Sequence, residues 1–554
     1  SPWISIFLFA VIFFVTPELV KAANEVINFN VDKNFDISGR VIVTAKLIKT
    51  SNNAYFYIEE AWWNSQDQTK KDKILNSLNN LSLEFDSKIY PVLTSMFGHE
   101  VRPGIDNDNR ITILFENINS GEGGYFREAD GYIKLQMPIS NEKEMVYLSL
   151  DYIEDPKVKT ILAHEFVHLI TFNQKNKILG IEEDVWLNEA RADYSSTILG
   201  YDDVYEGSNL QQRVKDFIKN SSDSVTEWTG GSIDYASSSM FMHYLVDHYG
   251  VNILTDSLKS KYTGIESLNY ALEKNNFKVN FSQIFTNWTV ALALNNCSIS
   301  ENYCYLNSNL KNFRILPTLN FLPVAGDVSL SADNATKNWS GNWLKFIGGN
   351  GNLELDFSSY YWLTFKIPYI IEDFSGNYTV NFLNLDDQAK GKIYVEKFGI
   401  DFKSLLIMPS IQSDFYSISE VEELYPFSYT VKIKSNIQLG DQELIKQLLN
   451  RIAYLKNEIA KLQNGGSAQN FCSALNNNLY FGMANNSDVK CLQQFLKNEG
   501  QNIYPEGLVT GNFAGLTKLA VIRFQEKYQI FNTGFVGPIT RMKINQLLKF
   551  TPTP

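Results

Sequence analysis

The sequence predicts a multidomain protein: an α+β domain, an all-β sandwich, a helical stalk and a small all-α domain. At 554 residues the chain is too long for a single hydrophobic core. Hydrophobic residues make up 44% and charged residues 20%, which is typical of folded protein. The apolar pattern also changes along the chain, from mixed to alternating at about residue 310 and to helical at about residue 441.

The first 22 residues are predicted to be a secretory signal peptide that lacks its start. The run WISIFLFAVIFFV is too short to span a bilayer comfortably, and Val20 and Ala22 are placed like the small residues before a signal-peptidase site. No Met and no basic segment precede the run, so the sequence is expected to begin inside the signal. An uncleaved anchor is the alternative. We therefore expect an exported protein without a stable membrane span after cleavage.

Residues 24–304 are predicted to form the α+β domain, because strands come first and helices follow. ISGRVIVTAKLIKT and NAYFYIEEAW alternate on either side of a turn, which predicts a β-hairpin. A helix is expected over about 69–96, followed by strands in RITILFENI, GGYFREADGYIKLQM and EMVYLSLDYI. From 156 to about 293 the apolar spacing is helical. Whether 24 to about 60 belong to this fold or to a removable propeptide stays open.

The stretch AHEFVHLITF carries His164 and His168 four residues apart on a predicted helix. Residues i and i+4 share one face of a helix, so both imidazoles can bind one cation, for which Zn²⁺ is the natural choice. Glu165 faces the open side of such a cation, where it can accept a proton from metal-bound water. The alternative is an amphipathic helix that carries two surface histidines.

A second predicted helix, WLNEARADYSS, supplies the third protein ligand that a catalytic zinc site needs. Glu189, 21 residues after His168, is the expected ligand of this single zinc ion. Asp193 lies one turn further along the same face, where its carboxylate can accept the other ring N–H of a ligating histidine. The acidic residues of the expected connecting loop are rival ligands: Glu182, Glu183 and Asp184.

HEFVH followed by NEARAD resembles the gluzincin metallopeptidases, whose pattern is HExxH and then a Glu with an Asp four residues later. More narrowly, IYPVLTSMFGHEVRPGIDNDNRITILF, GGYF, SNEKEMVYL, AHEFVHLITFN and WLNEARADY resemble the hyicolysin-like family over roughly residues 55–295. The resemblance implies a zincin fold and peptide-bond hydrolysis by metal-activated water, with Glu165 as general base. Arg191 departs from the small or apolar residue of related enzymes, and we expect it to alter the rim of the site.

The resemblance also implies one further donor to the tetrahedral oxyanion, a Tyr or His from the helical half. Tyr235, in SIDYASSSMFMHYLVDHYG, stands just before a predicted long helix, much as the aminopeptidase tyrosine does, and is the expected donor. His243 and His248 on that helix are competitors. For all three residues, packing or a surface polar tip is the alternative interpretation.

Two shorter motifs leave alternatives open. GGYF (123–126) is interpreted as an edge strand to which an extended substrate adds, or equally as a plain bulged strand. DNDNR (106–110) offers alternating oxygen ligands for Ca²⁺, but it lacks a downstream bidentate Glu and directly precedes a strand. We interpret it as a turn, with Ca²⁺ as the less favoured alternative.

Residues 310–435 are predicted to form a β-sandwich, from alternating runs such as NLELDFSS and NYTVNFLNL. Residues 441–463 hold apolar residues at a 3.5-residue period, which predicts a helical spacer or a short coiled coil, and NGGSAQN follows as a flexible linker. The cysteines form two local pairs that are expected to be disulfides rather than a zinc knuckle: Cys297 with Cys304, and Cys472 with Cys491.

Residues 470–550 are predicted to form a small helical domain with an internal echo. VTGNFAGLT and NTGFVGPIT each place a Gly-led turn before a Thr that can cap the next helix. LQQFL, the Gly-Thr turn, AVIRFQ and the closing GxxT resemble the peptidoglycan-binding domain of bacterial wall enzymes. Ala514 and Gly515 depart from its usual turn. The resemblance implies a wall-associated protein.

Together these features predict a secreted bacterial zinc endopeptidase whose partners are a protein or peptide substrate and peptidoglycan. The net charge of −12 argues against nucleic acid as a partner. Two alternatives stay open: a peptidoglycan stem-peptide hydrolase that uses the same zinc site, and a non-catalytic wall-associated adhesin on a zincin scaffold. The cleavage preference and the oligomeric state are not predicted.

Overall fold

The computed structural model describes most of the chain, in the ranges 25–324, 326–413, 423–435, 474–475, 477–484, 486–528, 530 and 532–549. Four sequence predictions fall wholly or partly on residues outside these ranges: the signal peptide (1–22), the helical spacer (441–463), the flexible linker NGGSAQN (464–470), and the pairing of Cys491 with Cys472, since Cys472 is not described. Within the described ranges, no helix has both the length and the apolar character that a membrane crossing requires.

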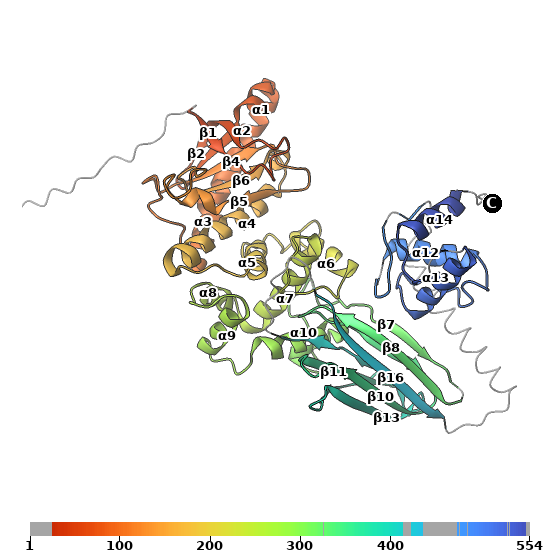
Figure 1. Ribbon diagram of the computed structural model, residues 1–554. Helices are drawn as coiled ribbons and strands as arrows, with labels where there is room; N and C mark the ends of the chain where they lie inside the picture. Colours follow the sequence, from red (N-terminus) through yellow and green to blue (C-terminus); the bar gives the residue numbers. More distant parts are fainter. Residues whose placement is uncertain are drawn as a thin grey trace, which may run out of the picture. The chain divides into compact units, whose positions relative to one another are not determined.

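The chain is divided into two compact units. The first holds the residues up to Glu182 together with Ser195–Tyr201, and the second holds Glu183–Tyr194 together with the residues from Asp202 onward. This division passes through the region 24–304 that was expected to be one domain. Helices, a mixed sheet and an all-β region are all present, so the chain is multidomain (Figure 1).

The first unit is built on a six-stranded sheet. Strands β2 and β3 pair antiparallel, which confirms the predicted hairpin. In contrast, β3, β4 and β6 run parallel to one another, and every residue of these three strands is buried. The strands, in the order β1-β2-β3-β4-β6-β5, are β1 (Val26–Asn30), β2 (Ile42–Thr50), β3 (Ala54–Glu59), β4 (Ile111–Glu116), β6 (Met145–Ser149) and β5 (Gly124–Phe126).

The strand predicted for GGYFREADGYIKLQM is right only at its start. Strand β5 ends at Phe126, and a 3-10 turn, η2 (Glu128–Gly131), follows it. The reason is Asp130, whose buried carboxylate accepts a hydrogen bond from the backbone N–H of Asn141 and so folds the chain back on itself. The remainder, up to residue 143, is a loop.

Helices cover the sheet of the first unit. The predicted helix over about 69–96 is continuous but contains a five-residue π-helical segment, η1 (Phe85–Ile89). Asp67 begins it by accepting a hydrogen bond from the Lys70 N–H. The other helical elements of this unit are α1 (Glu60–Ser65), α2 (Gln68–Glu84), α3 (Tyr90–Phe97), η3 (Leu150–Tyr152), α4 (Val158–Thr171) and η4 (Phe172–Lys177).

One buried carboxylate supports the sheet of the first unit. Glu116 ends β4, and its Oε1 accepts a hydrogen bond of 2.6 Å from the Tyr125 hydroxyl of β5. Within the described residues its Oε2 has no hydrogen-bond partner. Burial raises the pKa of Glu116 to about 7, and the nearby charge of Asp36 acts in the same direction.

Replacing Glu116 with Gln is expected to flatten the dependence of stability on pH. The pKa of Glu116 is about 7 in the folded protein and about 4.3 in an unfolded chain. The folded state therefore binds the proton more tightly, and the stability from this group is lost as pH rises from about 4 to 7. The free energy of unfolding, measured in urea, should fall between pH 5 and pH 8 by about 3 kcal/mol more in the parent than in the variant. An equal loss in both proteins would contradict this account.

The helices that the sequence predicts up to about 293 are present. Helix α10 begins with a reciprocal cap between Asn280 and Gln283 and ends at Asn295 in a left-handed conformation. The disulfide between Cys297 and Cys304 closes the loop that follows, as predicted. The helices are α5 (Val185–Ile198), α6 (Asn209–Lys219), α7 (Ser232–Tyr249), α8 (Asn252–Leu258), α9 (Gly264–Lys274) and α10 (Phe281–Leu294), with η5 (Glu301–Tyr303).

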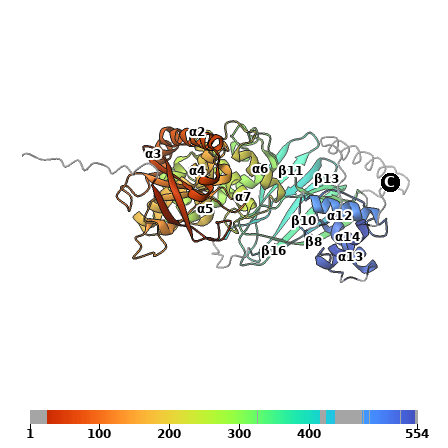
Figure 2. The same cartoon turned by 90° about the horizontal axis from the view of Figure 1, so that it is seen from above.

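The all-β region folds in two layers over one apolar core (Figure 2). One layer has the order β8-β16-β10-β13, and the other β12-β11-β14-β9-β7. Among the described strands, β13 and β14 connect the two layers through the pair Phe398 with Phe402. The strands are β7 (Thr318–Leu322), β8 (Val328–Thr336), β9 (Leu344–Gly348), β10 (Gly351–Ser359), β11 (Phe365–Asp373), β12 (Tyr378–Leu383), β13 (Lys390–Phe398), β14 (Phe402–Ile407), β15 (Ser410–Ile411) and β16 (Tyr425–Ser435).

The all-β region is fastened to helix α10 by two tryptophans. The indole N–H of Trp343 donates to the backbone carbonyl of Thr289 at 2.9 Å. The ring of Trp339 packs edge to face against Phe281 and Phe285, with centroids 4.9 and 5.5 Å away. Such aromatic contacts are favourable beyond the area that they bury. The region is therefore packed on the helices rather than joined to them by a linker alone.

In its described residues, the small C-terminal domain has three helices and a repeated hydrogen-bond pattern. Gln493 and Gln525 each donate to a buried threonine of the next helix, Thr517 and Thr540. Each glutamine oxygen also accepts from a glycine N–H of the preceding turn. The threonines are thus held inside the first helical turn and do not cap it, which corrects the prediction. The helices are α12 (Ser487–Asn498), α13 (Gly515–Lys527) and α14 (Pro538–Lys549).

Candidate metal centre

Helix α4 presents His164 and His168 on one face. Their Nε2 atoms lie 3.1 Å apart, and their rings meet edge to face. Two nitrogens bound to one Zn²⁺ at 2.0–2.1 Å in tetrahedral geometry are separated by about 3.3 Å. The apolar residues between them, including Phe166 and Val167, are buried, which fixes the rotation of the helix. Both imidazoles therefore point at one position.

Glu189 of α5 completes the set that the sequence predicts. One ligand atom from each of His164, His168 and Glu189 can be chosen so that all lie within 4.8 Å of one another. Across the described ranges, this is the only such group of three potential metal ligands. Two imidazole nitrogens and one carboxylate oxygen are the donors of a catalytic zinc site that keeps its fourth position for water. The residues fit the ion that the sequence predicts.

Glu165 lies buried beside strand β5. A Cβ atom at Gly124 would stand 3.1 Å from the Cγ of Glu165 and 2.6 Å from the carbonyl oxygen of Tyr147. A side chain at position 124 would therefore collide with the backbone of β6 and crowd the Glu165 side chain of α4. Strand β5 is the end strand of its sheet, and no described strand pairs with its outer edge. The structure thus favours the edge-strand interpretation of GGYF.

The rival ligand Glu183 is engaged elsewhere. Its Oε2 accepts from the Arg191 guanidinium at 2.9 Å, and its Oε1 accepts from the Gly264 N–H at 2.9 Å. Arg191 is 0% exposed, so the expectation that it alters the rim of the site was wrong. Position 191 lies about 200° around the helix from position 189, which turns Arg191 away from the metal ligands. Neither Glu182 nor Asp184 belongs to the ligand group.

Asp193 is held by residues of α6. Its Oδ1 accepts from the Arg213 Nη2 at 2.7 Å and from the Asn209 Nδ2 at 2.8 Å. The Arg213 Nε lies 3.1 and 3.2 Å from the two carboxylate oxygens. These charge-assisted bonds fix the carboxylate on its helix. Its contact with a ligating histidine stays a prediction.

Tyr235 lies in the first turn of α7, not before the helix as the sequence suggested. The Arg213 guanidinium stands over its ring, 4.8 Å from the centroid, and Trp228 packs edge to face against it at 4.8 Å. Neither Arg213 nor Trp228 is predicted from the sequence to lie near the site. No local motif marks them, because α6 meets α5 and α7 only in the folded chain.

The two competing histidines are placed for packing. His243 is buried against the ring of Tyr194, 4.9 Å between centroids, and burial lowers its pKa to about 4. His248 lies about 20 Å along α7 from Tyr235. Its Nε2 is 2.9 Å from the carbonyl oxygen of Cys304, in the disulfide loop. The choice of Tyr235 over the two histidines stays a prediction.

The side chains of DNDNR are used by the protein itself. Asp106 accepts from the Asp108 N–H and from the Lys143 ammonium, at 3.1 and 2.7 Å. Asp108 accepts from the Arg110 N–H at 3.0 Å and from the Tyr55 hydroxyl at 2.7 Å. Asp side chains that bond to the backbone two residues later are typical of turns. These contacts favour the turn interpretation.

Two comparisons with known proteins each match part of the chain. The chain is 30% identical over 240 residues to the neutral metalloprotease ShpI of Staphylococcus hyicus. The match covers 38% of this chain and 52% of the relative, so the chain spans about half the length of that relative. Residues 485–544 match the family model of a peptidoglycan-binding domain. These findings confirm both resemblances that the sequence predicts, to hyicolysin-like metallopeptidases and to a C-terminal peptidoglycan-binding domain.

Two of the solved structures that match each cover about a fifth of the chain. The pre-peptidase C-terminal domain of a collagenase from Bacillus anthracis is 8% identical, with a TM-score of 0.14, and covers 21% of this chain and 96% of its own. PliG, a periplasmic lysozyme inhibitor from Aeromonas hydrophila, is 11% identical, with a TM-score of 0.13, and covers 22% of this chain and 100% of its own. Similarities at this level carry no inference about function.

Proposed function

We propose that this protein is a zinc-dependent endopeptidase. The observation that carries the proposal is the convergence of His164, His168 and Glu189, with Glu165 buried on the same helix α4. The similarity to a neutral metalloprotease supports it. A Zn²⁺ held by these three residues would polarise the scissile carbonyl and lower the pKa of water to near neutral.

The side chains around the ligands have distinct roles in this proposal. Glu165 is the general base, which takes a proton from the attacking water and delivers it to the leaving amine. Tyr235 donates a hydrogen bond to the developing oxyanion. Arg213 and Trp228 hold the Tyr235 ring in place from two sides. Asp193 supports the ligands from the next turn of α5.

The substrate is proposed to bind as an added strand. The outer edge of β5 offers backbone hydrogen bonds to an extended polypeptide. Gly124 brings that edge against Glu165, so an added strand would pass beside the general base. A strand-like substrate also implies that folded proteins must open locally before they are cleaved.

Casein cleavage tests the endopeptidase proposal. The chain from residue 24, supplied with zinc, is expected to cleave casein, to stop when a chelator removes the metal and to recover when zinc returns. The peptidoglycan-binding domain favours one alternative, a stem-peptide hydrolase with the same zinc site. Release of peptides from purified sacculi without cleavage of casein would favour that alternative. A zinc-loaded protein that cleaves neither substrate would support the remaining alternative, a non-catalytic wall-associated adhesin.

The C-terminal domain is proposed to hold the exported enzyme at the cell wall. The full chain is expected to sediment with purified sacculi, whereas a variant that lacks residues 486–549 stays in the supernatant and keeps its activity on casein. Both fractions can be measured by gel densitometry after centrifugation. Sedimentation of the shortened variant to the same extent would place the wall contact elsewhere in the chain.

A further inference from the structure

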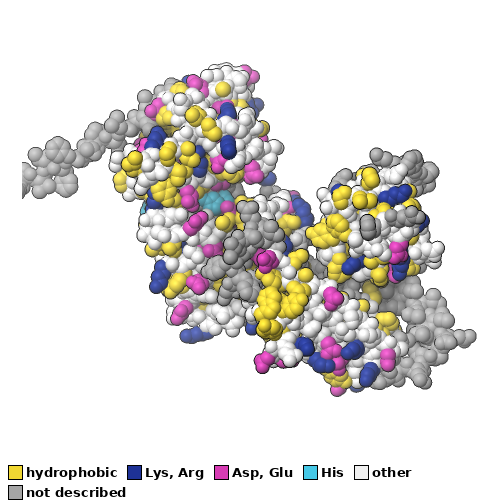
Figure 3. Space-filling view, in the orientation of Figure 1, with side chains coloured by type: hydrophobic (Ala, Val, Ile, Leu, Met, Phe, Trp, Pro, Cys, Tyr) yellow, Lys and Arg dark blue, Asp and Glu magenta, His cyan; other side chains and the backbone are white. Residues whose placement is uncertain are grey.

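The loop that follows β5, residues 127–143, exposes an apolar tip. Ile133, Leu135 and Ile139 are 42%, 91% and 56% exposed. Figure 3 shows hydrophobic side chains in several places on the visible surface of the first unit. Single exposed aliphatic residues are common, but three within seven residues of one loop form a surface that favours an interaction.

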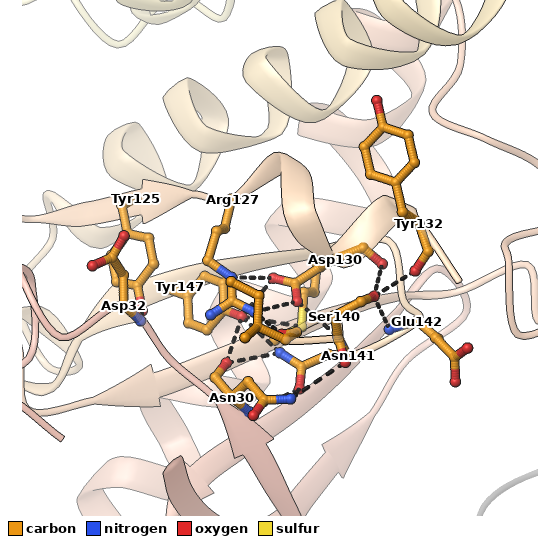
Figure 4. Close-up of polar contacts among 12 residues, drawn as sticks. Asn30, Asp32, Tyr125, Arg127, Asp130, Tyr132, Ser140, Asn141, Glu142 and Tyr147 are labelled. Carbon is orange, nitrogen blue, oxygen red and sulfur yellow. Dashed lines mark hydrogen bonds and ion pairs between the residues drawn. The ribbon is translucent and has the colours of Figure 1, made fainter. Parts of the chain in front are cut away.

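A network of hydrogen bonds around buried side chains connects the two limbs of this loop (Figure 4). Its hub is Asp130, which accepts hydrogen bonds from Arg127, from the Asn141 N–H and from the Tyr147 hydroxyl, at 2.9, 2.9 and 2.6 Å. On the far limb, the Ser140 hydroxyl donates to the carbonyl oxygen of Tyr132. Both limbs of the loop are thus tied together. A tip that is already ordered loses little conformational entropy when it binds a partner.

The loop lies at the His168 end of helix α4. Phe172, one turn beyond His168, packs so closely on the loop that a Cβ at Gly131 would stand 2.5 Å from its ring. Lys177 donates to the carbonyl oxygen of the same glycine at 2.7 Å. Gly124, at the start of β5, lies beside Glu165. Strand β5 therefore runs along α4 from the general base toward the apolar tip.

We propose that loop 127–143 is a substrate-binding element whose tip takes an apolar segment of the polypeptide that adds to β5. This inference rests on the proposed endopeptidase function. From Glu165 to Phe172 the helix rises about 10 Å, which an extended chain covers in about three residues. The preferred substrates are therefore unfolded polypeptides that carry aliphatic residues at least about three positions from the scissile bond. Shorter peptides do not reach the tip.

The test replaces Ile133, Leu135 and Ile139 together with Ser. We expect the KM for casein to rise roughly tenfold with kcat unchanged. The variant should lose a binding free energy about equal to that of burying one aliphatic side chain. Cleavage of the shortest peptide that the parent accepts should stay the same. Leu83→Ser on α2 is the matched control, since Leu83 is 67% exposed on a different element. Its kinetics should equal those of the parent.

Several results would overturn the inference. An unchanged KM for casein in the triple variant would do so, as would an equal loss on casein and on the short peptide. Sedimentation velocity tests whether the tip instead contacts a second copy of the protein. A parent that is a dimer and a variant that is a monomer would support that contact and overturn the inference. Failure of the endopeptidase proposal is seen separately, because the parent itself would then leave casein intact.

Discussion

Replacing Glu165 with Gln is expected to lower kcat on casein by about 10³-fold or more while the bound zinc stays unchanged. Gln keeps the size of the side chain but cannot accept the proton of the attacking water. The three ligands lie on other residues, His164, His168 and Glu189, so the metal site is retained. Zinc per chain, measured by mass spectrometry, and casein turnover check the two halves of the prediction.

Gly124→Ala is the companion variant for this prediction. Its methyl group would collide with the carbonyl oxygen of Tyr147 and crowd Glu165, so it displaces β5 without removing the base. We expect a smaller loss of kcat/KM, with zinc again retained. If Glu165→Gln kept most of the parent's turnover, the general base would have to be another residue and the proposed mechanism would be wrong.

Replacing Glu183 with Gln is expected to destabilise the second unit by about 3–5 kcal/mol. Arg191 is fully buried, and its Nε and Nη1 have no hydrogen-bond partner among the described residues. Removing the carboxylate of Glu183 therefore leaves the buried guanidinium of Arg191 without its ion-pair partner, which is strongly destabilising. Such a loss is a large part of the 5–15 kcal/mol that typically stabilises a folded domain.

Denaturation in urea at pH 7 measures this loss, with two control variants. Glu354→Gln removes one carboxylate from a solvent-exposed pair with Lys392, and should cost less than about 1 kcal/mol. The double variant Glu183→Gln with Arg191→Met removes both charges and should recover much of the stability. Similar losses of stability in Glu183→Gln and Glu354→Gln would show that removing the Glu183 carboxylate does not leave a costly buried charge.

Local patterns predicted the elements whose partners are close in sequence. The β2–β3 hairpin follows from alternation around a short turn, and the helix over about 69–96 follows from apolar spacing. Patterns did not reveal that β3, β4 and β6 pair in parallel, because their partners lie dozens of residues apart. They also missed the loop 127–143, where the buried carboxylate of Asp130 overrides the strand propensity of its apolar residues.

The sequence by itself determined the candidate metal-binding face of helix α4, since spacing along one helix places His164 and His168 on one face whatever surrounds them. It also pointed to Glu189 through the resemblance carried by NEARAD. Only the tertiary structure decided which charged side chains form ion pairs near these candidate ligands. Arg213 reaches Asp193 from another helix, and Arg191, next but one to Glu189, turns to a buried partner instead of the rim. Helix periodicity is local, whereas burying a charge beside its partner depends on how separate helices pack.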